Sequence, residues 1–235
     1  MTYTLPKNYL SYSQISLFQK DKEAYRMRYY PWYYRDHGHP EWTEKNGPAF
    51  ENAETIYGKH FAKLLETWDK THEGATDHET RIINRVPRYQ YKEYRIEVLI
   101  GDVPFLGVLD TFSKRCKRFK DYKTGKIPWD DVRLAKDTQM VIYSLLVKTK
   151  FKKVDNWCSL VWVPTKYKSV IEKVGSRMME GESREIELID TKPLIFKRRI
   201  ANWERERMKK QIVECARDIS EDYQNYLKNH HEPSK

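Results

Sequence analysis

Two aspartates and a lysine lie in two consecutive segments that are expected to pair as a β-hairpin. Asp110 ends the first segment, and Asp121 precedes Lys123 by two residues in the second. The numbers of Asp110 and Asp121 sum to 231, as do those of Arg115 and Cys116 at the midpoint of the connection. In a hairpin symmetric about that midpoint the two carboxylates lie opposite each other, with Cβ atoms about 4.5–5.5 Å apart.

Strand alternation then fixes which residues share a face with the acids. That face is predicted to hold Val108, Asp110 and Phe112 on one strand, and Phe119, Asp121 and Lys123 on the other. Two carboxylates at this spacing repel each other, and burial strengthens the repulsion. Lys123 can supply one compensating charge, and a divalent cation would supply the other. Oxygen ligands suit Mg²⁺ or Mn²⁺.

Two other interpretations of the same residues stay open. A plain Asp–Lys salt bridge on an exposed sheet face requires no metal. In addition, Arg115–Cys116 lacks the Asn-Gly type of chemistry that tight hairpin turns prefer, so a longer loop with a different register is possible.

Five segments, in order along the chain, resemble the RecB-type branch of the PD-(D/E)XK nuclease superfamily. They are Leu10–Ile15 (LSYSQI), Tyr57–His60 (YGKH), Gly107–Asp110 (GVLD), Asp121–Lys126 (DYKTGK) and the pair Gln139 and Tyr143. The set spans more than half of the chain. The resemblance implies a restriction-endonuclease-like core and hydrolysis of phosphodiester bonds.

The resemblance also implies roles for individual residues. Metal binding would fall to the side chains of His60, Asp110 and Asp121 and to the backbone carbonyl of Tyr122. Lys123 would orient or activate the attacking water and stabilise charge on the phosphate. A bound metal lowers the pKa of its water and polarises a phosphoryl oxygen, and a fixed cation stabilises the charge that grows in the transition state.

Gln139 and Tyr143 are four residues apart, so they are neighbours on one helix face. The resemblance implies that this pair positions the nucleic acid or the lysine in the active site. A surface Gln and a buried Tyr would also explain it. His60 lies at the edge of an apolar helix stripe, where a packing histidine is the alternative to a metal ligand.

The chain departs from the family pattern at two points. Leu109 takes the place of the proline that names the superfamily. Some RecB-type nucleases hold an iron–sulfur cluster with four cysteines, whereas this chain has only Cys116, Cys158 and Cys215. No cluster, disulfide framework or zinc knuckle is therefore expected, and Cys158 and Cys215 are predicted to pack in the core.

The elements that must position these residues can be predicted from capping and periodicity. Ser11 to Gln14 fits a capping box at the start of a helix with Ile15, Phe18 and Tyr25 inward. A second helix is predicted from Pro48, with its apolar stripe ending at Trp68. Residues 72–88 give no clear pattern.

Beyond residue 90 the apolar period changes from helical to alternating, which predicts strands at 94–100, 105–112 and 118–122. A helix at 131–148, a buried strand at 154–163 and a helical tail at 193–228 are expected to follow. The inward stripe of the tail is predicted to be Trp203, Met208, Ile212, Cys215, Ile219 and Tyr223. The predicted fold is a mixed α/β one, with a central mixed β-sheet flanked by helices. We find no repeat or linker and expect residues 1–235 to form one domain.

Composition limits the class of protein. The 235 residues include 44 Lys and Arg against 34 Asp and Glu, a net charge of +10, and 39% are hydrophobic. This is enough to bury a core, which excludes general disorder. No apolar run approaches the roughly 18 residues of a membrane span, and the first residues lack a secretory pattern, so the cytoplasm is the simplest compartment. The positive charge favours an anionic partner, nucleic acid first.

Basic and aromatic clusters suggest where nucleic acid could lie. Seven cations surround Asp121, namely Lys114, Arg115, Lys117, Arg118, Lys120, Lys123 and Lys126, and the tail from Lys192 to Lys210 holds eight cations against two acids. Such clusters can follow a phosphate backbone, although a solvated helix face is the better explanation of the tail taken alone. Trp32 or Arg35, in an aromatic stretch, could contact a single strand.

We therefore predict a Mg²⁺- or Mn²⁺-dependent deoxyribonuclease, most simply an exonuclease acting on DNA ends in recombination and repair. A structure-specific endonuclease is a variant of this prediction, and a catalytically silent nucleic-acid-binding or scaffold protein is the alternative. The chain has no P-loop motif, so the strand would have to arrive by diffusion or from a helicase or recombination partner; an oligomer is possible.

Overall fold

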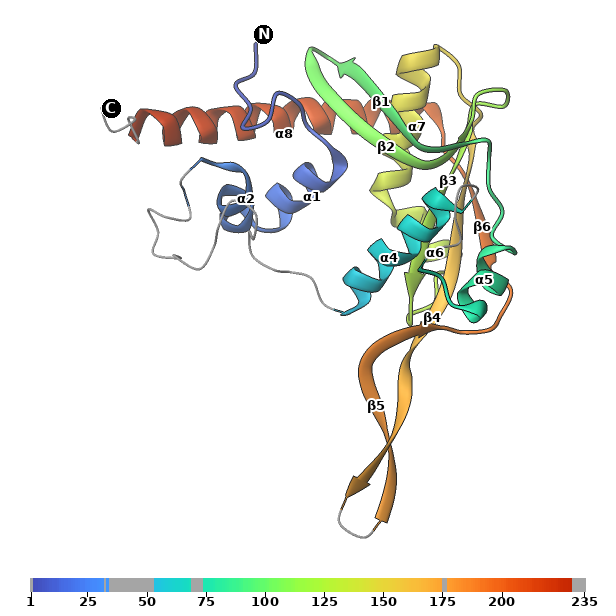
Figure 1. The fold of residues 1–235 in the computed structure, drawn as a ribbon. Coiled ribbons are helices and arrows are strands. Elements are labelled where there is room, and N and C mark those ends of the chain that lie inside the picture. Colours follow the sequence, from blue (N-terminus) through green and yellow to red (C-terminus); the bar gives the residue numbers. More distant parts are fainter. Residues whose placement is uncertain (1, 32, 34–52, 69–73, 175–176, 230–235) are drawn as a thin grey trace.

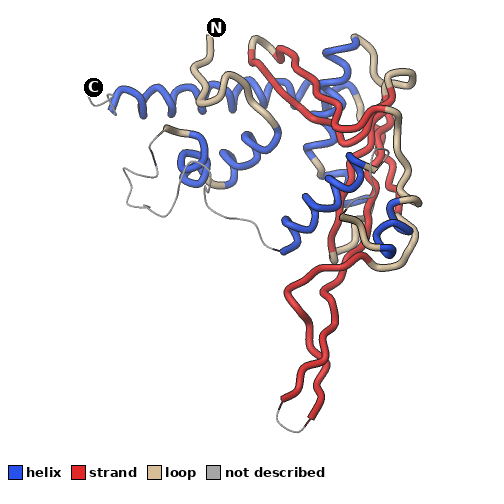
Figure 2. Tube along the Cα trace, viewed as in Figure 1, coloured by secondary structure: helices blue, strands red, loops and turns tan. Residues whose placement is uncertain are grey.

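A six-stranded mixed β-sheet forms the centre of the molecule in this computed structural model, which describes residues 2–31, 33, 53–68, 74–174 and 177–229 (Figures 1 and 2). The strands are β1 (Tyr91–Ile100), β2 (Val103–Ser113), β3 (Arg118–Gly125), β4 (Trp157–Val174), β5 (Arg177–Leu188) and β6 (Leu194–Arg199). Their order is β1-β2-β3-β4-β5, and β6 also pairs with β4. Only β3 and β4 run parallel among these pairs.

Helices pack on both faces of this sheet, which confirms the predicted fold class. They are α1 (Tyr12–Lys20), α2 (Lys22–Tyr29), α4 (Ala53–Thr67), α5 (Asp77–Ile83), α6 (Asp131–Lys136), α7 (Thr138–Phe151) and α8 (Asn202–Asn229). Alternate residues of β4 separate the two faces. Val161 and Val163 pack with α4 and α5, whereas Cys158 and Leu160 belong to the larger core with α7 and α8.

Aspartates divide two stretches that periodicity alone predicts as single helices. Asp21 ends α1 and caps α2 by accepting from the Ala24 amide. Asp137 ends α6 and caps α7 in the same way through the Met140 amide. The predicted helix at 131–148 is therefore wrong at this point, because an N-cap aspartate adopts extended backbone and restarts the helix.

The predicted N-terminal cap is confirmed in part. The Ser11 hydroxyl accepts from the Gln14 amide, but the Gln14 side chain donates to the carbonyl of Tyr9 instead of closing a capping box. The predicted start of the second helix, from Pro48, lies outside the described residues, as do Trp32 and Arg35; the described helix α4 begins at Ala53.

The C-terminal third differs most from the prediction. β4 continues to Val174 and pairs with β5 as an arm that extends away from the rest of the sheet (Figure 1). Residues 194–199 form β6, not helix, because they pair with β4. Trp203, predicted to be inward, is 62% exposed at the start of α8, while Met208, Ile212, Cys215 and Ile219 are buried as predicted.

The β2–β3 hairpin has the predicted register. Thr111 pairs with Lys120, Phe112 with Phe119, and Ser113 with Arg118, so each pair sums to 231. The connection is a four-residue turn that contains Lys117 at a φ of 54°. A register fixed by the hairpin thus brings Asp110 and Asp121 to neighbouring positions at the end of this ladder.

Along β2 the predicted strict alternation is wrong. A Cβ on Gly107 would lie 2.2 Å from Leu146 of α7, yet Phe112 also faces α7, where it stacks on Phe151 at 5.4 Å. Residues 107 and 112 would occupy opposite faces of a regular strand. The irregularity falls near Asp110, since the β1–β2 ladder leaves out Glu93 and Asp110, and Glu93 has a φ of 43°.

No helix in the described ranges is both long enough and apolar enough to span a membrane.

Candidate active site

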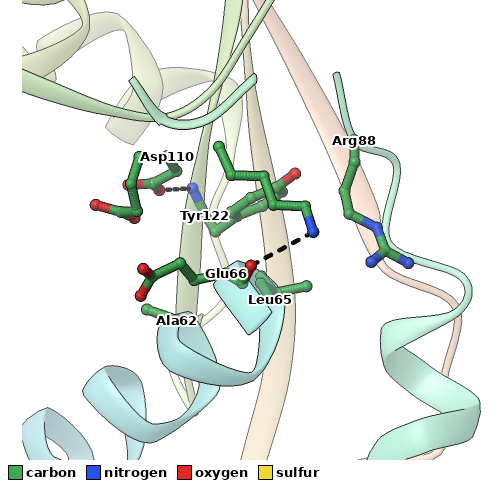
Figure 3. Close-up of a pocket in the computed structure, with 8 residues that line it drawn as sticks. Ala62, Leu65, Glu66, Arg88, Asp110 and Tyr122 are labelled. Atoms are coloured by element: carbon green, nitrogen blue, oxygen red, sulfur yellow. Dashed lines mark hydrogen bonds between the residues drawn. The ribbon is translucent and has the colours of Figure 1, made fainter. Parts of the chain in front are cut away.

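Asp110 lies where β2 separates from β3. Its Oδ2 accepts a hydrogen bond of 2.6 Å from the backbone amide of Tyr122, the residue after Asp121 (Figure 3). The last residues that pair between β2 and β3 are Thr111 and Lys120, which lie next to Asp110 and Asp121 in the sequence. The Asp110 carboxylate therefore satisfies a β3 amide next to the second acid.

Asp121 is almost completely buried, with 2% of its surface exposed. Its Oδ2 lies 2.9 Å from the Nζ of Lys123, on the same face of β3. Apart from this ion pair with Lys123, Oδ2 has no donor among the described residues. A buried carboxylate oxygen in this state is incompletely compensated.

The pKa values of the acid pair follow from this shortage of compensation. Burial raises the pKa of Asp110, and the charge of Asp121 raises it further, against the opposing effects of the Tyr122 amide and Lys123. Burial also raises the pKa of Asp121, although Lys123 opposes it. For Lys123, burial alone would lower the pKa, but the attraction of Asp121 and Asp110 outweighs it and raises the pKa.

Helix α7 holds the lysine from its other side. Lys123 Nζ donates to Gln139 Oε1 at 2.8 Å, and Gln139 Nε2 donates to the Tyr143 hydroxyl at 2.8 Å. Gln139 lies in the first turn of α7 because Asp137 caps this helix. Gly107 permits α7 to approach β2 this closely, since any Cβ there would collide with Leu146. The expected adjacency of Gln139 and Tyr143 is present, and Gln139 contacts the lysine.

His60 on α4 has a different partner. Its Nε2 lies 3.1 Å from Oε1 of Glu79, and its side chain is 41% exposed. Glu79, 7% exposed, also accepts from the hydroxyl of Tyr57 and closes a capping box with Thr76. Burial would raise the pKa of Glu79, but these hydrogen bonds outweigh it and hold the pKa below its ordinary value.

The structure thus gathers Asp110, Asp121, Lys123, Gln139 and Tyr143 around the end of the hairpin, with the Tyr122 backbone between the acids. It does not join His60 to them. In the parts of the chain that are described, no group of three or more His, Cys, Asp or Glu side chains is placed to hold a metal. The helix of His60 nevertheless approaches β3 closely, because a Cβ on Gly58 would lie 3.3 Å from Thr124 Oγ1.

The acid pair itself suits a divalent cation. Asp121 is buried and Asp110 is half-buried, and Lys123 contacts Asp121 while its charge also acts on Asp110. Apart from this ion pair, Asp121 Oδ2 has no donor among the residues that the structure describes. Oxygen donors of this kind are the ligands of Mg²⁺ and Mn²⁺. The donors present therefore fit such an ion at Asp110 and Asp121.

Two glutamates beside the predicted residues escape prediction from the sequence. Glu93 lines a pocket with Asp110, Tyr122 and Glu66, and burial, followed by the charge of Glu66, raises its pKa (Figure 3). A lone glutamate in a strand with alternating charges gives no signal. Glu79 did have one, because Thr76 and Glu79 fit a capping box within the segment that gave no clear pattern.

No protein-family model matches the chain, and no curated protein matches it. In fold the chain is similar to a crystal structure from Eubacterium rectale that bears the name "Putative exonuclease", with a TM-score of 0.51. The two sequences are 13% identical, and the match covers 92% of this chain and 82% of that chain. At this identity the likeness concerns the fold alone.

Proposed function

We propose that this protein is a divalent-metal-dependent deoxyribonuclease of the RecB-type PD-(D/E)XK branch, an exonuclease that removes nucleotides from DNA ends. The observation that carries the proposal is the half-buried Asp110 beside the buried Asp121, with Lys123 fixed against Asp121. The nuclease-like fold supports it. We treat residues 1–235 as one nuclease domain.

The two carboxylates and the backbone carbonyl of Tyr122 would hold Mg²⁺ or Mn²⁺. When bound, such an ion polarises a phosphoryl oxygen and makes its water a better nucleophile at neutral pH. His60 is the fourth proposed ligand. Glu79 occupies its Nε2, which leaves Nδ1 as the nitrogen available for a ligand, and a carboxylate in this position orients a metal-binding histidine.

Lys123 acts as a fixed positive charge in this proposal. Asp121 and Gln139 hold its Nζ from two sides, so the ammonium does not need to reorganise when negative charge grows on the phosphate. Its raised pKa keeps it protonated at neutral pH. Stabilisation of charge and orientation of water are therefore the roles assigned to it, and proton abstraction is not.

Gln139 is a positioning residue, because it connects Lys123 to Tyr143. The substrate is DNA with free ends. We place the reaction in cytoplasmic DNA recombination and repair, where a helicase or recombination partner would supply the strand.

The test is digestion of end-labelled linear, nicked and closed circular DNA with Mn²⁺ or Mg²⁺. We expect loss of the linear form, with closed circles intact. Cleavage of closed circles would instead identify an endonuclease.

One observation favours a second candidate, a nucleic-acid-binding protein without catalysis. In the described chain, His60 pairs with Glu79 and no three-ligand group forms. If purified protein binds DNA but degrades no form of it with either metal, this candidate replaces the nuclease.

A further inference from the structure

The beginnings of β3 and β4 and the adjoining strand β6 carry a second surface with different chemistry. Lys120 of β3 pairs with Ser159 of β4, and Ser159 pairs with Lys197 of β6. Two residues earlier on β4, Trp157 pairs with Arg199. Residues paired directly across strands share a face, as do residues two apart on one strand. We call the surface formed by Arg118, Lys120, Trp157, Lys197 and Arg199 the basic sheet face.

This face points away from the larger core. Cys158 and Leu160, which alternate with Trp157 and Ser159, are 2% and 0% exposed in that core. On the same side as Ser159, Val161 is covered by α4 and α5, but the cover does not reach Trp157, which is 47% exposed. The basic sheet face is therefore an open part of a sheet whose continuation is buried.

The surface also lies on the other side of β3 from Asp121 and Lys123. Lys120 immediately precedes Asp121, so the two side chains leave the strand in opposite directions. Asp121 faces Lys123 and the α7 side, whereas the Lys120 ammonium lies 3.7 Å from the centre of the Tyr89 ring. The surface is thus distinct from the face of β3 that carries Asp121 and Lys123.

Positive charge dominates this face. Arg118 forms an ion pair of 2.7 Å with Asp155, but Lys120, Lys197 and Arg199 have no acidic partner within the described part of the chain. Burial lowers the pKa of Lys120, with no acid to offset it. The basic sheet face thus has four cations, one acid and an exposed indole ring. This composition is complementary to a polyanion that also contains aromatic rings.

We propose that the basic sheet face binds single-stranded nucleic acid as a second site. The cations would contact phosphates, and Trp157 would stack on a base, the combination by which single strands are held without sequence preference. Lys120 and Lys197 flank Ser159 with backbones about 10 Å apart, since neighbouring strands lie about 4.8 Å apart. A strand could run along this row whether or not the acid pair cleaves it.

The test is fluorescence anisotropy of a labelled oligonucleotide of about 20 nucleotides with the full chain in EDTA, where metal-dependent cleavage does not occur. We expect Lys197→Gln with Arg199→Gln to weaken binding about tenfold. The slope of log affinity against log salt should fall by about 1.4, at about 0.7 for each phosphate that is no longer neutralised. Trp157→Ala should weaken binding at least about fivefold, and Trp157→Phe should restore most of it.

The matched control is Arg217→Gln with Lys228→Gln. Both residues are exposed on α8, and the two substitutions remove the same charge. Equal loss of affinity in the two double variants would overturn the proposal, because net charge alone would then explain it. Unchanged binding by Trp157→Ala, or displacement of the oligonucleotide by an equal charge of polyglutamate, would also overturn it. Binding is measured without metal and without cleavage, so failure of the nuclease proposal leaves this result distinguishable.

Discussion

The molecule holds aspartates in two regions with opposite electrostatic outcomes. On α8, Asp222 accepts from Arg26 at 3.0 and 2.5 Å and from the Tyr30 hydroxyl at 2.5 Å. Burial would raise the pKa of Asp222, but these bonds outweigh it and hold the pKa below its ordinary value. At the end of the hairpin, Lys123 pairs with Asp121 and acts on Asp110 only through its charge, and burial raises the pKa of both aspartates.

The difference separates a structural carboxylate from a functional one. The Asp222 carboxylate accepts three hydrogen bonds from Arg26 and Tyr30, so it joins α2 to α8. It has no capacity left for a ligand. The acid pair has two carboxylates and only one ammonium beside them. Such arrangements are typical of binding or catalytic sites, where the missing charge arrives with the ligand.

The largest expected effect is on cleavage. Asp121→Ala and Lys123→Ala should each reduce DNA cleavage at least about a thousandfold, because each removes part of the electrostatic stabilisation of the transition state. Folding, followed by circular dichroism, and most DNA binding should persist. Asp222→Asn and Lys153→Gln serve as matched controls and should cleave within about twofold of the wild type. If the controls lose as much activity as the site variants, the two regions do not differ in function.

Metal affinity should respond next. His60→Ala is expected to weaken Mn²⁺ binding about 10–100-fold in calorimetry, in the range for the loss of a ligand or of its orientation. His78→Ala is the control, since its ring binds the Leu188 carbonyl and no acid of the site. Unchanged affinity in His60→Ala would remove His60 from the ligands and leave the acid pair as the whole metal site.

The sequence predicts the hairpin end of the site well, because the residues that determine the hairpin register are close to one another in the sequence. The symmetric connection and the alternation near Phe112 and Phe119 are enough to bring Asp110 and Asp121 together. The same logic fails at Gly107, where the strand is irregular, because nothing local reports the positive φ of Glu93 on the neighbouring strand.

The remainder of the fold depends on contacts between distant residues. Strand β6 forms because residues 194–199 pair with β4, more than thirty positions earlier, and its sequence alone is compatible with the start of the tail helix. The partnership of His60 with Glu79 depends on how α5 packs beside α4. Tertiary contacts of this kind override local secondary-structure propensity.

For stability, the order of the two regions should be reversed: a change at Asp222 should cost more than a change in the acid pair. Asp222→Asn should lower the free energy of unfolding by about 1–3 kcal/mol, because it leaves the partly buried Arg26 without its charged partner. Asp218→Asn, an exposed change on the same helix, is the control. Asp110→Asn should be neutral or stabilising in EDTA, since it removes a carboxyl group whose charged form is disfavoured by burial and by Asp121. Urea unfolding measures all three, and a larger loss in Asp110→Asn than in Asp222→Asn would reverse the comparison.

The smallest expected effect is the pH dependence of stability in metal-free protein. Burial and Asp121 raise the pKa of Asp110 to about 8, so the folded state binds this proton more tightly than the unfolded chain does. The resulting stabilisation is complete below the ordinary aspartate pKa and is lost as the pH rises towards 8. Asp222, with its lowered pKa, has the opposite sign and loses its contribution only as the pH falls.

In EDTA, the melting temperature should therefore fall by a few degrees between about pH 5 and about pH 9, and Asp110→Asn should reduce this fall. A change of 1 kcal/mol in stability corresponds to about 2–4 °C in melting temperature. Added Mn²⁺ should remove the fall, because the ion takes the place of the proton. Asp222→Asn should leave this alkaline fall unchanged and instead flatten the loss of stability in acid. An identical alkaline fall in Asp110→Asn and wild type would mean that the acid pair is compensated as fully as Asp222.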